Sequence, residues 1–341
     1  MNNWSLIFRL PAAVLFGMAV RLRHFLYDSH LLRSYTVPVP TVCVGNLAVG
    51  GTGKTPMVEW LVRTLSPHFR VAVLSRGYRR KSHGFVLADA DATVWRIGDE
   101  CMQLHKRFPR VPVAVCENRV KGIRRLLKEC PDVQVVVLDD AFQHRRLRCG
   151  FSMLLTTADR PFVSDHMLPW GRLRDLVIRS RKADTVVVTK CPPTLRPIDK
   201  RLINKSLNLS PWQSLYFSSL RYAPFPAWVE RLPAGADVLL VACIAQPVFL
   251  VDYVRSRFPN VRVLTFSDHH LWSASELKTL EKEALSASVV FTTDKDMARW
   301  QVMELSANFR SKLCPVSVSI EIEGADALEK QIVRYISSCR F

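Results

Sequence analysis

Short apolar runs alternate with longer amphipathic stretches along most of the chain. The apolar runs lie at residues 41–46, 70–77, 111–117, 133–140, 150–157 and 183–190. Nearly continuous Val and Leu runs are typical of strands that are buried on both faces, as in a parallel sheet covered by helices. Between these runs, residues 55–65 and 118–130 have the pattern of helices. We therefore predict an α/β fold with a mostly parallel sheet flanked by helices.

A second set of alternating elements follows a proline-rich break at residues 191–200. Its apolar runs lie at residues 213–220, 236–245, 261–270 and 288–296, and a last helix is predicted near 325–338. We predict a larger domain over residues 35–205 and a smaller α/β domain over 206–341. In this prediction, the last helix can pack either within the smaller domain or back on the larger one. The boundary falls within 191–225.

The first 30 residues predict a separate helix. Only eleven uncharged residues separate Arg9 from Arg21, which as a helix is about half the thickness of a bilayer core. At 100° per residue, one face collects the bulky apolar residues Ile7, Val14, Leu15, Met18, Leu22, Phe25 and Leu26. The opposite face collects Ser5, Arg9, Gly17, Arg21, Arg23, His24 and Asp28. This pattern favours a helix lying in a membrane interface; the alternative is a terminal helix that packs on its own domain.

Charge and cysteine content narrow the class of protein. The formal net charge of +18 favours acidic partners such as nucleic acid, an anionic membrane surface or a phosphorylated substrate. The nine cysteines contain no C-x-x-C pair, so neither a disulfide framework nor a zinc site is indicated. A reducing cytosol is the simplest compartment for such a chain.

A glycine-rich loop follows the first apolar run, in the sequence VGNLAVGGTGKTP at residues 44–56. It matches the phosphate-binding P-loop pattern except that Ala48 occupies the first glycine position. We predict that ATP binds to Gly50, Gly51, Thr52, Gly53, Lys54 and Thr55. Lys54 is expected to reach the β- and γ-phosphates and Thr55 to bind Mg²⁺.

Acidic and histidine residues stand at the ends of other apolar runs. Asp139 and Asp140 close a Val-rich run, as does the metal-binding carboxylate of P-loop enzymes. Asp99 and Glu100 form a second acidic pair. Residues 268–270, Asp-His-His, end a run in the smaller domain, where a histidine can act as a general base or simply lie on the surface.

Basic clusters occupy several loops of the predicted sheet. They lie at residues 75–81, 145–148, 171–175 and 179–182. Charge runs are usually solvated, but several of them beside a phosphate-binding sheet are better explained by an acidic substrate. Nucleic acid is less favoured, because no recognised nucleic-acid-binding motif accompanies the charge.

The ordered set of motifs resembles one known family. VGNLAVGGTGKTP, SRGYRRK, GDE, LDDAFQHR, PWGRLRD, VTK, IAQP, FSDHH and TTDKD follow one another between about residues 40 and 296. This order is similar to that of the tetraacyldisaccharide 4'-kinase family, which phosphorylates a lipid A precursor. The resemblance implies transfer of the γ-phosphate of ATP, with Mg²⁺, to the 4'-hydroxyl of a lipid-linked disaccharide 1-phosphate. It also implies a peripheral or monotopic protein on the cytoplasmic face of the inner membrane, with no nucleic acid and no obligate protein partner.

The resemblance also assigns roles to single residues. The family's catalytic pair falls on Asp99 and His269, with Lys54 beside the phosphates, and the metal ligands fall on Thr55, Asp139 and Asp140. The expected substrate-binding residues are Asn46, Arg76, Tyr78, Arg119, Gln143, His144 and Arg174. We further predict that the smaller domain brings His269 within reach of Asp99.

The sequence departs from the family pattern at a few positions. Ala141 and Arg79 stand where the pattern has glycine, Asp175 stands where it has glutamate, and Trp170 and Cys243 also differ. None of these coincides with the expected catalytic, phosphate-binding or metal-binding residues. The departures therefore bear on substrate detail.

Two other classes of protein remain open from the residues alone. A P-loop GTPase is one, although Pro192 occupies the position where the guanine-binding N-K-x-D motif has its aspartate. A nucleic-acid-binding protein is the other, suggested only by the positive charge. Nucleotide preference and retention on DNA would distinguish them.

Overall fold

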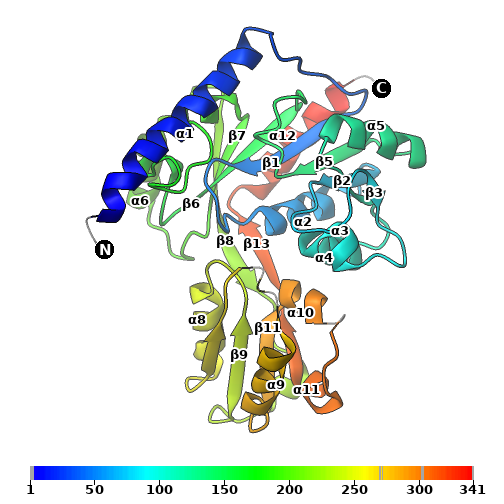
Figure 1. The fold of residues 1–341 in the computed structure, drawn as a ribbon, viewed down its shortest axis with the longest axis vertical. Coiled ribbons are helices and arrows are strands. Elements are labelled where there is room, and N and C mark those ends of the chain that lie inside the picture. The colour runs from blue at the N-terminus through cyan, green and yellow to red at the C-terminus, as the bar shows by residue number, and fades with distance from the viewer. Residues whose placement is uncertain (1–3, 269, 271, 301–302, 340–341) are drawn as a thin grey trace. The chain divides into compact units, whose positions relative to one another are not determined.

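The computed structural model describes residues 4–268, 270, 272–300 and 303–339. The chain folds into two units (Figure 1). The first contains the described residues up to Leu220 and those from Ile320 onward, and the second spans Arg221–Ser319. The chain passes between the units within two strands, β8 (Ser214–Tyr222) and β13 (Val318–Ile322).

The larger sheet has nine strands in the order β13-β8-β7-β6-β1-β5-β2-β4-β3. Besides β8 and β13, its strands are β1 (Thr41–Asn46), β2 (Val71–Ser75), β3 (Val86–Leu87), β4 (Val113–Val115), β5 (Val135–Asp139), β6 (Phe151–Thr157) and β7 (Thr185–Thr189). The neighbouring pairs from β8 to β4 are parallel, whereas β3 runs antiparallel to β4. The predicted α/β class and mostly parallel sheet are confirmed.

Helices cover both faces of this sheet because its central strands are apolar on both sides. Val42 and Val44 of β1 pack with α2 (Lys54–Leu65), α4 (Asp99–Arg107) and α12 (Ala325–Ser338). Cys43 points to the opposite face and packs with α5 (Arg119–Glu129), as strand alternation requires. Farther along that face, α6 (Pro197–Leu207) contributes Leu207. The last helix of the chain, α12, thus belongs to the core of the first unit.

Strand β1 lies in the middle of the sheet, between β5 and β6. The carboxyl ends of parallel strands share one edge, and ligands of open α/β sheets bind at that edge, where the strand order changes direction. Three short elements lie among the connections: α3 (Val94–Ile97) and the 3₁₀ helices Phe162–Ser164 and Val177–Lys182. The residues that follow β1, β2 and β5 are therefore the place to look for a site.

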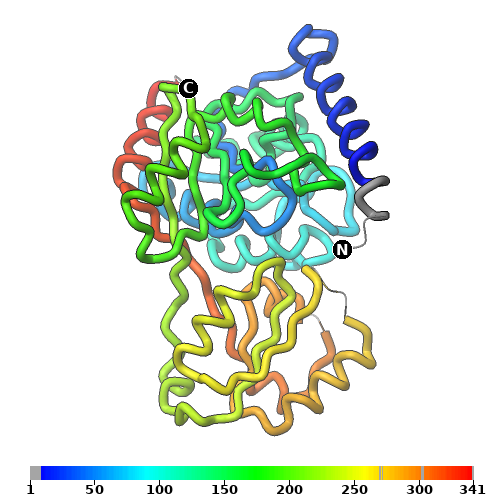
Figure 2. The backbone as a smooth tube through the Cα atoms, turned by 90° about the vertical axis from the view of Figure 1, so that its left-hand side faces the viewer, coloured from blue at the N-terminus to red at the C-terminus, as the bar shows by residue number. Residues whose placement is uncertain are grey.

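Helix α1 (Trp4–Asp28) lies along the outside of the first unit (Figures 1 and 2). Ala13, Gly17 and His24 face the protein and are buried. The bulky apolar side chains are instead exposed: Val14, Leu15, Met18, Leu22 and Phe25 each have 51–64% of their surface exposed. The helix therefore packs through Gly17 and His24, which the helical wheel placed opposite the bulky apolar residues, and through Ala13, which the wheel assigned to neither face. Within the described part of the chain, no helix has the length and apolar character needed to span a bilayer.

The second unit has its own parallel sheet, in the order β10-β9-β11-β12. The strands are β9 (Val238–Ala242), β10 (Arg262–Thr265), β11 (Val289–Thr293) and β12 (Leu313–Val316). The helices are α7 (Ala227–Glu230), α8 (Val248–Arg257), α9 (Ala274–Glu283), α10 (Asp294–Trp300) and α11 (Ala307–Lys312). Helix α8 packs on one face of the sheet, and α9 and α11 pack on the other. The prediction of a second, smaller α/β sheet is confirmed.

Candidate active site

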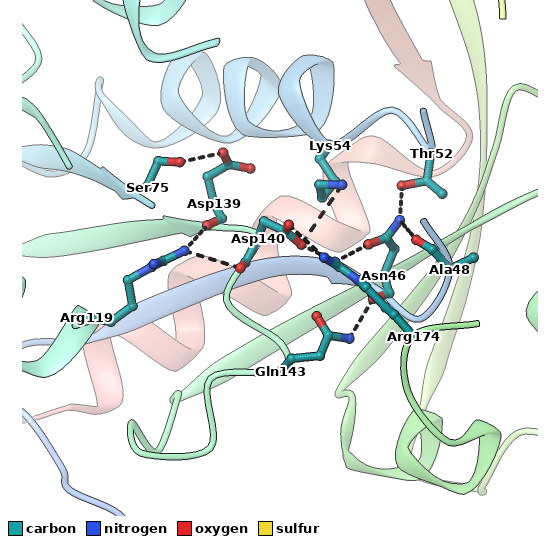
Figure 3. Close-up of polar contacts among 10 residues, drawn as sticks. All are labelled: Asn46, Ala48, Thr52, Lys54, Ser75, Arg119, Asp139, Asp140, Gln143 and Arg174. Carbon is teal, nitrogen blue, oxygen red and sulfur yellow. Dashed lines mark hydrogen bonds and ion pairs between the residues drawn. The ribbon is translucent and has the colours of Figure 1, made fainter. Parts of the chain in front are cut away.

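The glycine loop connects the end of β1 to the start of α2 (Figure 3). Gly50 and Gly53 have φ values of 110° and 84°, in the region that only glycine adopts without strain. Gly53 caps α2, so the helix begins at Lys54 with its first N–H groups directed toward the loop. Ala48 is not among the described residues with positive φ, which explains why an alanine is tolerated at the first glycine position of the pattern.

The loop is held by hydrogen bonds from two strand ends. The Asn46 Nδ2 amide donates to Ala48 O at 2.6 Å and to Thr52 Oγ1 at 2.8 Å. From β7, the Thr189 hydroxyl lies 2.9 Å from Thr52 O. Asn46 is fully buried, so its side chain supports the loop from within the protein. These contacts hold the loop at Ala48 and Thr52.

Asp139 ends β5 beside the end of β2. The Ser75 hydroxyl donates to Asp139 Oδ2 at 2.9 Å. The second oxygen, Oδ1, is buried and accepts no hydrogen bond from any described residue. Burial, together with the negative charges of Glu100 and Asp140, raises the pKa of Asp139. A buried carboxylate oxygen without a donor is the kind of group that binds a cation.

Asp140, the next residue, is held by cations. Its φ of 49° turns the chain sharply at the end of the strand. Lys54 Nζ lies 3.9 Å from Asp140 Oδ1, and Arg174 donates to both carboxylate oxygens, one of them at 3.0 Å (Figure 3). Burial alone would raise the pKa of Asp140, but the charges of Lys54, Arg174 and Arg119 lower it to about 2. Asp140 is therefore ionised at neutral pH.

Further contacts surround this acidic pair. Arg174 also donates to Asn46 Oδ1 at 2.5 Å, and Gln143 Nε2 donates to Asn46 O at 2.8 Å. Arg119 is buried and donates to the backbone carbonyls of Asp139 and Asp140 at 3.2 and 3.3 Å. The structure thus brings together six of the predicted site residues, which the sequence scatters between positions 46 and 174. Whether they also contact a substrate stays a prediction.

Close approach of two chain segments makes this cluster possible. A side chain at Gly45 would bring a Cβ to 2.4 Å from Phe142 Cβ, far inside contact distance. Glycine at this position therefore lets the turn after β5 lie directly against the end of β1. This contact places the Asp140–Gln143 turn beside Asn46.

Asp99 and Glu100 form the first turn of α4. Asp99 is buried, with 5% of its surface exposed. The negative charge of Glu100 contributes to the raised pKa of Asp139, and both acids contribute to the raised pKa of Cys101 after the effect of its burial. The start of α4 therefore adds negative charge near the end of β5.

Three predicted substrate-binding residues lie around this cluster. Burial and then the charges of Arg119 and Arg23 lower the pKa of His144 to about 4, so its imidazole is neutral at pH 7. Its Nε2 is buried and has no hydrogen-bond partner within the described residues. Arg76 and Tyr78 are exposed. A neutral histidine among arginines suits a site for an acidic ligand.

Asp268 and His270 of the Asp-His-His run follow β10, a strand of the smaller sheet. His269 is outside the described residues, so its predicted pairing with Asp99 stays a proposal. Asp268 Oδ1 lies 2.9 Å from Lys295 Nζ. His270 Nε2 lies 3.2 Å from Glu276 Oε1, and its ring packs on Phe266 and Trp272 with centroid distances of 5.0 and 4.9 Å. Both neighbours of His269 are thus held by their own contacts.

Sequence reasoning missed residues that support the site. Ser75 and Thr189 lie at strand ends, where their hydroxyls bond to Asp139 and to the glycine loop. Glu59, buried in α2, accepts a hydrogen bond from Gln103 Nε2 at 2.8 Å and ties α2 to α4. The sequence signal for a buried Glu59 was its position inside the apolar run MVEWLV. The hydroxyls gave no signal beyond their place at strand ends.

Comparison with known proteins gives consistent matches. A family model described as tetraacyldisaccharide-1-P 4'-kinase matches residues 5–337. The tetraacyldisaccharide 4'-kinase of Bacteroides thetaiotaomicron is 41% identical over 350 residues, which cover 96% of this chain and 92% of the relative. That of Flavobacterium johnsoniae is 41% identical over 294 residues, covering 85% and 86%.

A solved structure matches the fold. The crystal structure of LpxK from Aquifex aeolicus in complex with ATP has a TM-score of 0.73 at 24% identity, and the match covers 96% of this chain and 98% of that one. At this identity the likeness supports the fold, whereas the family follows from the sequence matches. The chain therefore belongs to the tetraacyldisaccharide 4'-kinase family and is a phosphotransferase.

Proposed function

We propose that the edge of the first sheet binds ATP and directs its γ-phosphate to the 4'-hydroxyl of a tetraacyldisaccharide 1-phosphate. The observation that carries this proposal is the convergence of Lys54, Asp139 and Asp140 beside the glycine loop. A lysine and a helix N-terminus stabilise phosphate charge, and most of the catalysis of phosphoryl transfer comes from such positioning and charge stabilisation.

The residues fit a magnesium ion. Asp139 offers a buried oxygen without a hydrogen-bond donor, and Thr55 lies in the first turn of α2, after Lys54. No group of three or more His, Cys, Asp or Glu side chains within the described ranges is arranged to hold a metal. Mg²⁺ does not require such a group, because it usually takes one or two carboxylates together with phosphate and water. When bound, the ion would neutralise charge on the phosphates.

A proton acceptor is needed for the sugar hydroxyl, which is a poor nucleophile at neutral pH. Asp99 is our candidate, since it is buried at the start of α4, near the cluster. His269 would orient Asp99 and share its proton, as in other catalytic pairs. Arg76, Tyr78, Gln143 and His144 would contact the disaccharide and its existing phosphate.

Helix α1 is proposed to lie on the cytoplasmic face of the inner membrane. Its exposed side carries Val14, Leu15, Met18, Leu22 and Phe25. Arg9, Arg21 and Arg23 are also exposed on the same helix. An exposed apolar face flanked by cations binds the interface of an anionic bilayer. This location suits an enzyme whose acceptor is a lipid.

The transfer itself is tested with purified protein, labelled ATP and tetraacyldisaccharide 1-phosphate in detergent micelles. We expect label in the lipid, dependent on Mg²⁺, with ATP preferred over GTP. Preference for GTP and hydrolysis without acceptor would favour the GTPase alternative. Retention on DNA that falls steeply with salt, without lipid phosphorylation, would favour nucleic-acid binding.

Membrane binding has a matched test. Met18→Glu combined with Leu22→Glu places two charges on the exposed face of α1 and should lower co-sedimentation with anionic vesicles. The control pair is Ile198→Glu with Leu202→Glu on α6, because these residues have the same spacing and the same exposed fractions, 51% and 59%. Equal binding by both variants would contradict the proposed role of α1.

A further inference from the structure

The C-terminal half of α1 is attached to the first unit by a buried hydrogen bond between side chains. His24 Nε2 lies 2.6 Å from Asp175 Oδ1, and the two residues have 5% and 1% of their surface exposed. Arg145 lies 3.2 Å from His24 Nδ1. Because a guanidinium only donates, Nδ1 is the acceptor and the proton is on Nε2, directed at Asp175.

A second set of contacts joins α1 to the turn after β5. Arg23 donates to Gln143 O at 2.8 Å, and Arg145 donates to Asp28 Oδ1 at 2.6 Å. The Arg145 guanidinium also lies 5.0 Å from the ring centroid of Tyr27. The helix is thus held at two places, the turn containing Gln143 and the segment containing Asp175.

Both of these segments also hold the phosphate site. Arg174, adjacent to Asp175, bonds to the Asp140 carboxylate and to Asn46 Oδ1. Gln143 bonds to Asn46 O through its side chain, while its own carbonyl accepts from Arg23. One series of contacts from α1 to Asn46 therefore runs through Gln143. The other runs through the neighbouring residues Asp175 and Arg174.

We propose that α1 positions the phosphate site as well as meeting the membrane, and that His24 and Asp175 are the positioning residues that link the two. The inference rests on the proposed function of Asp140 and Arg174. When the His24–Asp175 pair is intact, the segment carrying Arg174 is fixed, and with it Asp140 and Asn46. Loss of the pair releases that segment without changing the exposed apolar face of the helix.

The chemistry of the pair favours this role. Removing the His24 ring would take a hydrogen-bond donor away from the buried Asp175 carboxylate, and a buried acceptor without its donor is destabilising enough to favour movement of the segment toward water. Asp175 Oδ1 also accepts from Leu176 N at 2.8 Å, which leaves little freedom for its carboxylate.

The test uses the full-length protein with His24→Phe, which keeps a ring of similar size, and His24→Gln, whose amide can still donate to Asp175. Transfer is measured in detergent micelles at saturating lipid, and binding to anionic vesicles is measured separately. We expect His24→Phe to lower kcat about tenfold or more, with less change in the KM for ATP and unchanged vesicle binding. His24→Gln should recover most of the lost kcat.

A double substitution shows whether His24 acts through Arg174. In an Arg174→Gln background, His24→Phe should have little further effect on kcat, because the segment it positions has already lost its contacts. The control is His68→Phe, which breaks another His–carboxylate pair, His68–Glu329 at 3.1 Å, and should leave kcat unchanged.

Several results would overturn the proposal. These are a normal kcat in His24→Phe, losses that multiply with Arg174→Gln, or a parallel loss of kcat and vesicle binding. The proposed function fails by a different result: a Lys54→Ala variant that still transfers phosphate. The two failures are therefore distinguishable.

Discussion

The carboxyl edges of the two sheets differ in how their acidic groups are neutralised. In the first sheet, Asp139 keeps a buried oxygen without a donor and Asp140 is bound by side chains from distant parts of the chain. In the second sheet, Asp296 Oδ2 accepts from Cys243 N at 2.9 Å and from the Thr293 hydroxyl at 2.8 Å, both at neighbouring strand ends. Its Oδ1 also lacks a hydrogen-bond donor within the described residues, but lies 3.7 Å from Arg299 on the same helix. The acids of the first edge are thus contacted by side chains from distant parts of the chain, whereas Asp296 joins β9 to β11.

This difference shows that the parallel topology determines where a site can form, whereas the residues at the strand ends determine what chemistry the site can carry out. Both edges have strand ends followed by helices, yet only the first carries a glycine loop before a twelve-residue helix. The second instead has Asp296 within a seven-residue helix, with its carboxylate turned back to the strands. The following substitutions test that contrast.

The largest effect is expected for Lys54→Ala. Lys54 lies beside Asp140 and is the cation proposed to contact the phosphates, so its loss should lower phosphate transfer about a thousandfold while the protein stays folded. Radioactive transfer assays and circular dichroism measure the two quantities. Lys128→Ala is the control, because Lys128 is exposed in the last turn of α5. Near-normal turnover in Lys54→Ala would contradict the proposal that phosphate binds at the carboxyl edge of the first sheet.

The second prediction concerns the proposed catalytic pair. Asp99→Asn and His269→Ala should each lower kcat about a hundredfold, with less effect on the KM for ATP. The double variant should be little worse than the poorer single one, because the two groups act as a unit. If the losses of kcat in the two single variants multiply in the double variant, Asp99 acts as the base without His269. His83→Ala, an exposed histidine, is the control.

Asp296→Ala should act on stability rather than on the chemical step. Without the carboxylate, the Cys243 N–H and the Thr293 hydroxyl lose their partner, which costs about 2 kcal/mol. Hydrogen exchange should rise in β9 and β11, while ATP affinity measured with a fluorescent analogue stays the same. Lys278→Ala, at an exposed position in α9, is the control. Loss of ATP affinity without faster exchange would contradict the structural role of Asp296.

The smallest expected effect is a pH dependence from His144. Its folded-state pKa is lowered to about 4 by burial and nearby arginines, against about 6.5 when unfolded. Between pH 6.5 and 4 the unfolded chain binds more protons, so stability falls as the pH falls through that window. Urea midpoints at pH 7 and 5 should therefore differ less in His144→Gln than in the wild type. If the midpoints of the variant and the wild type differ equally between the two pH values, a group other than His144 causes the pH dependence of stability.

Much of the first site could be predicted because local patterns marked it. Apolar runs ending at Asn46, Ser75 and Asp139 predict parallel strands, and parallel strands end at one edge. The glycine loop then supplies the phosphate chemistry. The separate environments of Asp139 and Asp140 could not be predicted, because they depend on a positive φ at Asp140 and on Arg174, which is 34 residues away.

The packing of α1 could be predicted only in part. The helical wheel placed Gly17 and His24 opposite the bulky apolar residues, and the structure has these two residues buried and the apolar residues exposed. The burial of a histidine could not be predicted, because its ring is hydrogen-bonded to Asp175, 151 residues away.

The two sides of α1 should consequently accept sequence change in different ways. On the side proposed to face a fluid bilayer, Leu15 or Met18 should be exchangeable for almost any apolar residue of similar bulk. On the protein side, a bulkier residue at the buried Ala13 would push the helix outward and strain the contacts at His24, whereas a Cβ at Gly17 would lie at ordinary contact distances, 3.7 Å from Arg21 and 3.9 Å from Met167. The exposed side of such a helix should therefore vary in shape among sequences while its hydrophobicity stays roughly constant, and the protein side should vary much less.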